Sequence, residues 1–177
     1  MGNIFGKFMT TILHYFAYGS NMHPNRLRAR VPSARAVGRA ELPGHMLRFH
    51  KRGRDHSGKC NALATGRPAD RIIGVIYDMA AAERIHLDMA EGLGAGYELD
   101  YATLPCQGQS REVFFYRAHP DHTDDSLRPF DWYRALVLEG GRFHSLPQTY
   151  LALIEAVETM MDLNGARREL HQRLLSP

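Results

Sequence analysis

Tyr15-Phe16-Ala17-Tyr18-Gly19-Ser20-Asn21-Met22 (YFAYGSNM) ends a short aromatic and aliphatic run that begins at Ile12, and Pro24 follows it. Proline favours the first turn of a helix, so the order predicts a buried strand, a polar turn and a helix. In such a turn several backbone N–H groups lack partners and point together, near the positive end of the helix dipole. The turn is a candidate pocket for an anion or oxyanion. An ordinary turn capped by Ser20 or Asn21 explains the same residues.

The segments that follow predict an α+β fold. A helix over residues 23–30 must end near Pro32, because proline disfavours helical geometry in the residue before it. Helices are also expected over residues 129–140 and 146–163, followed by a polar amphipathic segment to Leu175. Segments rich in strand-compatible residues and bounded by Gly or Pro predict strands over residues 34–42, 45–51, 59–65, 71–78, 97–104 and 112–117. Strands dominate the first two-thirds and helices the end, which is typical of an α+β domain with an antiparallel or mixed sheet.

The composition is that of one globular domain. The chain has 177 residues, of which 44% are hydrophobic, and a formal net charge of +3. Its length suits a single domain, and we expect a flexible leader over residues 1–11, a domain over residues 12–163 and a helical tail over residues 164–177. Charged residues, histidine or glycine interrupt every apolar run before it reaches the ~20 residues that a membrane helix needs. A membrane-spanning protein is therefore excluded.

Charge and cysteine usage narrow the class further. The isoelectric point of about 9.0 is compatible with nucleic-acid binding. The first part of the chain contains arginines at positions 26, 28, 30, 35 and 39. They lack interleaved aromatic residues, so we expect them to solvate a helix and a strand, and we expect no nucleic-acid partner. Cys60 and Cys106 stand alone, which supports neither a zinc ribbon nor a redox pair and favours the cytoplasm.

Glu91 is a second candidate functional residue. It ends a helix predicted over residues 80–91 by composition and by the spacing of Ile85 and Met89, with Gly92 as the terminating residue. The C-terminal end of a helix disfavours a negative charge. If apolar neighbours also exclude water, the carboxylate becomes a usable general acid or base near neutral pH. The alternative is a solvated surface glutamate.

Other motifs give weaker signals. The glycines at 92, 94 and 96 follow a helix and lack the spacing of a dinucleotide loop, so we expect them to shape a turn beside Glu91. The segment over residues 119–125 contains potential metal ligands, but its composition is typical of a solvated connection. Ser20 lacks the G-x-S-x-G context of a nucleophilic serine, and Cys60 lies in an apolar strand where a core position is expected. These observations predict no metal and no cofactor.

In their order and approximate spacing, the segments YFAYGSNM, RLRARVPSA, GVIYDM, LDMAEG and WYRALVLEGG resemble the gamma-glutamylcyclotransferase family. The resemblance covers about residues 14–153. It implies a small α+β domain built around a mixed, barrel-like sheet. It also implies conversion of a small-molecule γ-glutamyl amide to 5-oxoproline and a free amine.

The same resemblance implies roles for individual residues. Glu91 matches the catalytic acid/base of the family, and Tyr133 matches a tyrosine that contacts the substrate. The substrate-binding loop of the family is matched by Tyr15, Phe16, Ala17, Tyr18, Gly19 and Ser20. Asn21 completes the candidate anion site at the end of this loop.

The chemistry of a γ-glutamyl amide agrees with these residues. Its own α-amine can attack the γ-carbonyl, and such intramolecular attack has effective molarities of up to ~10⁵–10⁸ M. The protein must then move protons and stabilise the oxyanion. The alternative is a non-catalytic module that binds a γ-glutamyl or other carboxylated ligand, but a carboxylate at position 91 would disfavour an anion and so favours the enzyme. The leaving group stays open among an amino acid, a lysine ε-amine, Cys-Gly and a specialised amine.

Overall fold

The main sheet is mixed, as the sequence predicts. Its strands are β1 (Ile12–Ala17), β2 (Arg35–Pro43), β5 (Arg71–Ala80), β6 (Tyr97–Cys106) and β7 (Gln109–Ala118), in the order β2-β5-β1-β7-β6. β1 is antiparallel to β5 and parallel to β7. The computed structural model describes residues 11–175, so the expected leader apart from Thr11, and the last two residues of the expected tail, lie outside the described residues.

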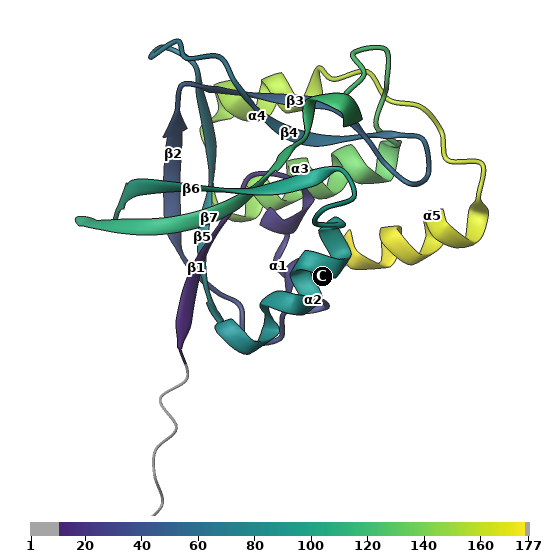
Figure 1. Ribbon diagram of the computed structural model, residues 1–177. Coiled ribbons are helices and arrows are strands. Elements are labelled where there is room, and N and C mark those ends of the chain that lie inside the picture. Colours follow the sequence, from purple (N-terminus) through teal and green to yellow (C-terminus); the bar gives the residue numbers. More distant parts are fainter. Residues whose placement is uncertain (1–10, 176–177) are drawn as a thin grey trace, which may run out of the picture.

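The sheet curls into a half-barrel, with β6 and β7 running across the direction of β1 and β5 (Figure 1). A second, two-stranded sheet is formed by β3 (His45–Arg52) and β4 (Gly58–Ala64). Asn61 joins the two sheets, because its amide oxygen accepts a hydrogen bond of 2.7 Å from the backbone of Ala118 in β7. One continuous hydrophobic core fills the space between the sheets and the helices.

Apart from α3, which is shifted by two or three residues toward the C-terminus, the helices are shorter than the sequence predicts. They are α1 (Pro24–Arg28), α2 (Arg84–Glu91), α3 (Asp131–Phe143), α4 (Gln148–Glu155) and α5 (Gly165–Gln172). Four 3₁₀ turns, η1 (Ser20–Met22), η2 (Ala81–Glu83), η3 (Pro120–His122) and η4 (Arg173–Leu175), lie between or beside them. Within residues 11–175 no helix combines the length and the apolar character that a membrane crossing requires.

The prediction of a helix over residues 146–163 is wrong for the second half of this range. α4 ends at Glu155, and the chain then runs in irregular form beside the start of α3. The backbone of Met160 donates to Pro129 at 3.0 Å and accepts from Asp131 at 3.1 Å. These pairings need extended backbone at Met160, and an apolar run alone does not reveal them.

Helix α2 forms where it is expected, but with a different face inward. Gly92 ends it in the left-handed conformation, with φ of 71°, as the sequence predicts. Leu87 is its fully buried residue, whereas the side chains of Ile85 and Met89, whose spacing predicted the helix, are 57% and 70% exposed. The helix therefore packs through one apolar residue, and Glu91 at its C-terminal end contacts Asn21 of the turn after β1.

Gly140 lets α3 approach the turn that follows β1. A Cβ atom at this position would lie 2.6 Å from the backbone nitrogen of His23 and 2.8 Å from the carbonyl carbon of Met22. Only a residue without a side chain permits this contact. Because α3 lies so close to the turn, its residues Trp132 and Tyr133 reach the same region as the polar turn.

Candidate active site

Two adjoining hollows meet at Glu91. The inner recess is narrow, and the outer cavity has a volume of about 280 Å³. Both are lined by Ser20, Glu91, Tyr97 and Tyr133. The inner recess is otherwise lined by Tyr15, Tyr18, Gly19, Asn21, Cys60 and Tyr116. Glu91 therefore stands where a ligand that occupies both hollows would pass from one to the other.

The polar turn after β1 forms one wall of the inner recess. Its own backbone bonds join Met22 N to Gly19 O at 2.9 Å and His23 N to Ser20 O at 3.2 Å. Within residues 11–175 the amide groups of Ser20 and Asn21 have no backbone acceptor. No side chain caps either η1 or α1, so the alternative of an ordinary capped turn does not describe this segment. The turn offers two N–H donors to a ligand oxygen.

Glu91 is held by one carboxylate oxygen. Oε1 accepts hydrogen bonds from Nδ2 of Asn21 at 2.9 Å and from Nη1 of Arg30 at 2.6 Å. Arg30 also donates to Oδ1 of Asn21 at 2.9 Å, so the three side chains fix one another. Among the described residues Oε2 has no hydrogen-bond partner. The side chain is 17% exposed, which rules out the solvated surface glutamate and leaves one oxygen to face a ligand.

The tyrosines of the inner recess are neutral hydrogen-bonding groups. Burial raises the pKa of Tyr18, Tyr97 and Tyr133 well above the usual value. The hydroxyl of Tyr97 donates to the carbonyl of Cys60 at 2.5 Å, and the hydroxyl of Tyr133 accepts from its amide at 3.1 Å. Tyr18 donates to the carbonyl of Tyr116 and accepts from the amide of Ala62 in β4. These bonds set the positions of the rings around the recess.

Cys60 is a buried thiol between these tyrosines. Its side chain is 2% exposed, and burial raises its pKa to about 12. A thiol in this state is a poor nucleophile at neutral pH, because the thiolate is the reactive form. The expectation of a core cysteine is therefore confirmed, although the residue also borders the recess.

The outer cavity is rich in cations. Arg26, Arg30, Lys51, Arg54 and Lys59 line it, against the two carboxylates of Asp55 and Glu91. Asp55 pairs with Lys59 at 2.8 Å, as Glu91 does with Arg30. The remaining cations leave the cavity positively charged and suited to an anionic ligand.

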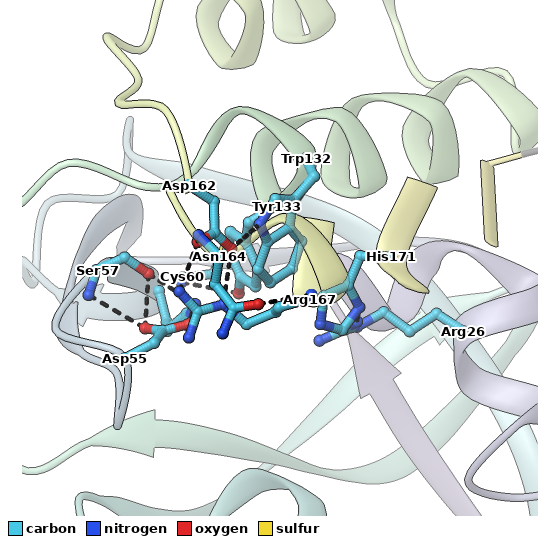
Figure 2. A network of polar contacts seen from close by, with 11 residues as sticks. Arg26, Asp55, Ser57, Cys60, Trp132, Tyr133, Asp162, Asn164, Arg167 and His171 are labelled. Atoms are coloured by element: carbon cyan, nitrogen blue, oxygen red, sulfur yellow. Dashed lines mark hydrogen bonds and ion pairs between the residues drawn. The ribbon is translucent and has the colours of Figure 1, made fainter. Parts of the chain in front are cut away.

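Helix α5 contributes His171 to the lining of the outer cavity. Figure 2 shows how Asp162 ties this helix to α3: it accepts a bond of 2.9 Å from the indole of Trp132 and two bonds of 2.6 Å from Arg167. One turn further along, His171 stacks on Trp132, with ring centres 3.9 Å apart and planes 16° apart. Asn164 caps the helix by accepting from the amide of Arg167. The segment expected as a tail thus supplies part of the cavity.

The structure brings most of the predicted site residues together. Tyr15, Tyr18, Gly19, Ser20, Asn21, Glu91 and Tyr133 all line one or both hollows. Phe16 and Ala17 line neither and are fully buried in the core. Phe16 points away from Tyr15 because side chains alternate along a strand, and its ring packs against Phe115. Ala17 lies opposite Val75 in the sheet and is covered.

Sequence reasoning missed the inward position of Arg26, in α1, and of Arg30, two residues after the end of this helix. We expected Arg26 and Arg30 to solvate the helix, and both instead point into the outer cavity. Helix α1 has five residues, which is too short for a periodic pattern to show which face is inward. In the helix predicted over residues 23–30, the spacing of four residues places the two arginines on one face. That spacing could have indicated that both contribute to the same site.

Comparisons with known proteins identify the family and the fold that this chain resembles. Residues 15–135 match the family model described as "Gamma-glutamyl cyclotransferase, AIG2-like". Among curated proteins, the human and bovine gamma-glutamylcyclotransferases are 27% and 26% identical over 147 residues, which cover 81% of this chain and 78% of each relative.

The fold also matches solved structures. A structure described as a gamma-glutamyl cyclotransferase has a TM-score of 0.80 at 22% identity and covers 92% of this chain and 99% of its own. A human protein described as uncharacterized has a TM-score of 0.78 at 23% identity and covers 91% and 98%. The family match extends over more than half of the sequence, from β1 with its polar turn to Tyr133 in α3. The chain therefore belongs to the AIG2-like gamma-glutamyl cyclotransferase family.

Proposed function

We propose that the protein converts a γ-glutamyl amide into 5-oxoproline and a free amine, with Glu91 as the general acid and base. The observation that carries this proposal is the position of Glu91 at the junction of the two hollows, with Oε1 fixed and Oε2 without a hydrogen-bond partner among the described residues. A general base must lie within reach of the proton that it removes. At the junction, Oε2 can reach both the α-amino group and the leaving nitrogen of a substrate that spans the hollows.

The reaction needs little beyond proton transfer and charge stabilisation. Oε2 of Glu91 takes a proton from the α-amino group, whose nitrogen attacks the γ-carbonyl carbon and closes a five-membered ring. The resulting oxyanion and the α-carboxylate are the groups that the amides of Ser20 and Asn21 can bind. Glu91 then returns the proton to the leaving nitrogen, and the carbon–nitrogen bond breaks. The substrate supplies its own nucleophile, so the buried thiol of Cys60 has no part in this scheme.

The direct test is release of 5-oxoproline from a panel of γ-glutamyl compounds. We expect release from at least one of them, unchanged by a chelator. Glu91→Gln keeps the shape of the side chain and removes proton transfer, so turnover is expected to fall by ~10²–10⁴-fold while the melting temperature changes little.

Glu98→Gln is the matched control. Glu98 is exposed on β6 near Arg117 and His119, and it lines neither the inner recess nor the outer cavity. Its substitution should leave turnover within about twofold, since surface substitutions have small effects. Ligand binding without release of 5-oxoproline from any compound would instead support the non-catalytic binding module. Loss of activity in Glu98→Gln, with activity retained in Glu91→Gln, would refute the role of Glu91.

A further inference from the structure

Arg26 is a buried cation without an anionic partner. Its side chain extends from α1 into the outer cavity, and the residue is 8% exposed. Within residues 11–175 no carboxylate oxygen lies within 4 Å of its guanidinium, and its Nε atom has no hydrogen-bond partner. Burial, and next the charge of Arg30, lower its pKa to about 10. A buried charge is costly unless it is paired, so this guanidinium is arranged for an anion that the ligand brings.

His171 holds this guanidinium. Its Nδ1 atom lies 3.2 Å from Nη1 of Arg26, and its ring is fixed by the stack on Trp132. Burial lowers the pKa of His171 to about 4, with Arg26 and Lys59 acting in the same direction. The imidazole is therefore neutral at pH 7 and can accept a hydrogen bond from Arg26 through Nδ1. A neutral acceptor orients the guanidinium without neutralising it, so the positive charge stays available.

The position of Arg26 in the outer cavity identifies which part of the substrate its guanidinium would contact. Gly19, Ser20 and Asn21 of the polar turn line the inner recess, where the γ-glutamyl end belongs under the proposed function. Arg26 lines the outer cavity and does not line the inner recess. The part of the substrate beyond the scissile bond must therefore lie beside Arg26.

We propose that Arg26 binds a carboxylate on the leaving amine, and that His171 is the residue that positions Arg26 for this contact. This inference rests on the proposed cyclisation and deepens it. Arg26 is thus a specificity-determining residue, and among γ-glutamyl amides it favours those whose leaving amine carries a carboxylate over those of simple amines. Arginine suits the task because its planar fork matches both oxygens of a carboxylate.

The test compares two substrates that differ at one group. γ-Glutamylalanine carries a carboxylate on the leaving amine, and γ-glutamylalaninamide carries a neutral amide at the same place. Hydrogen bonds to charged groups contribute enough for a preference of about 10–100-fold in kcat/KM, so the wild-type protein should prefer the acid by this factor. In Arg26→Gln, kcat/KM for the acid should fall by the same factor, and kcat/KM for the amide should change by less than about threefold.

Two variants separate positioning from packing. His171→Phe keeps a flat ring on Trp132 and removes the acceptor, so it should raise KM for the acid by about 3–10-fold and leave kcat nearly unchanged. Arg28→Gln is the matched control, because Arg28 lies on the same helix but is exposed. It should preserve the preference of the wild-type protein.

The outcomes distinguish this inference from the proposed function. Turnover of neither substrate would contradict the cyclisation itself. Equal turnover of both substrates by the wild-type protein would overturn the role of Arg26 even if Arg26→Gln failed to fold. An equal loss on both substrates in Arg26→Gln would place the guanidinium on the γ-glutamyl end, which also overturns the inference. Loss of the preference in Lys51→Met but not in Arg26→Gln would assign the carboxylate to Lys51, the other buried cation of the cavity.

Discussion

The inner recess and the outer cavity share four residues and differ in almost everything else. The inner recess is lined by tyrosine rings, a thiol and a short turn of backbone, all uncharged apart from Glu91. The outer cavity is lined by five basic side chains and by His171 of α5, among others. Rigid, neutral surroundings suit a group that is the same in every substrate. Long cationic side chains suit a group that varies in length and is recognised by charge.

A bulky side chain at Gly19 should distort the inner recess and abolish turnover of every substrate. A Cβ atom here would lie 2.9 Å from Cβ and 3.2 Å from Sγ of Cys60. The φ angle of −115° is open to any residue, so the constraint is this contact and not the backbone conformation. Gly19→Val should displace the turn and lower turnover of every γ-glutamyl substrate by about 10²-fold or more, since small misplacements of reacting groups have effects of this size.

Two variants make the result at Gly19 specific. Gly165→Val places the same side chain where no atom lies within 4 Å of the new Cβ, and it should keep its activity. Ser20→Ala leaves the backbone donors in place, so turnover should fall by less than about fivefold. A greater loss in Ser20→Ala than in Gly19→Val, with circular dichroism unchanged, would assign the chemistry to the hydroxyl.

Asp162 offers a way to open the outer cavity alone. Its side chain is fully buried and accepts bonds from Trp132 and Arg167. Asp162→Ala leaves the indole N–H of Trp132 unpaired and releases α5, so the free energy of unfolding should fall by about 2–4 kcal/mol. Below the melting temperature, the preference for γ-glutamylalanine over its amide should also decrease. Urea denaturation checks the first effect, and substrate kinetics checks the second.

Asp121→Ala is the control for this experiment. The Asp121 side chain is 85% exposed, and its substitution should change the unfolding free energy by less than about 0.5 kcal/mol. If Asp162→Ala lowered stability but kept the full preference for the acid, α5 would be a structural support without influence on the ligand.

The smallest expected effect is a dependence of stability on pH that comes from His171. The pKa of an unperturbed histidine is near 6.5, and the folded value here is about 4. Between these values the unfolded chain binds a proton at this residue and the folded chain does not, so stability falls as pH decreases from 6.5 and levels off near pH 4.

The charges that oppose protonation of His171 are those of Arg26 in α1, Arg30 just after α1, Lys59 in β4 and Arg167 in α5. His171→Phe removes the titrating group. The loss of unfolding free energy between pH 7 and pH 5 should be smaller in this variant than in the wild-type protein, by an amount on the order of 1 kcal/mol. Equal losses would show that the fold does not lower the pKa of His171, and the imidazole would then be partly protonated near pH 6.5 instead of neutral throughout this range.

The residues that sequence reasoning placed correctly carry local signals. The turn after Tyr18 is marked by Gly, Ser, Asn and a following Pro, and Glu91 is marked by the end of a helix and Gly92. The residues that it misplaced depend on distant partners. Arg26 is 145 residues from His171, and Met160 pairs with backbone near Phe130, so no spacing along the chain reports either contact. Periodicity predicts which residues form an element, and packing decides which of them face a ligand.

The hydrogen bonds of Cys60 limit how the specificity of this protein can evolve. Both of its backbone polar groups are satisfied by tyrosine hydroxyls from the main sheet and α3, so the same rings that shape the inner recess also fasten β4 to the rest of the molecule. Replacing Tyr97 or Tyr133 by phenylalanine leaves a buried carbonyl or amide without a partner, at a cost of about 1–3 kcal/mol. Mutations of the tyrosines that surround the γ-glutamyl end of the substrate therefore lower the stability of the protein directly. Arg54 of the outer cavity has no ion pair among the described residues, so mutations at this position do not, and new leaving groups are more readily acquired there.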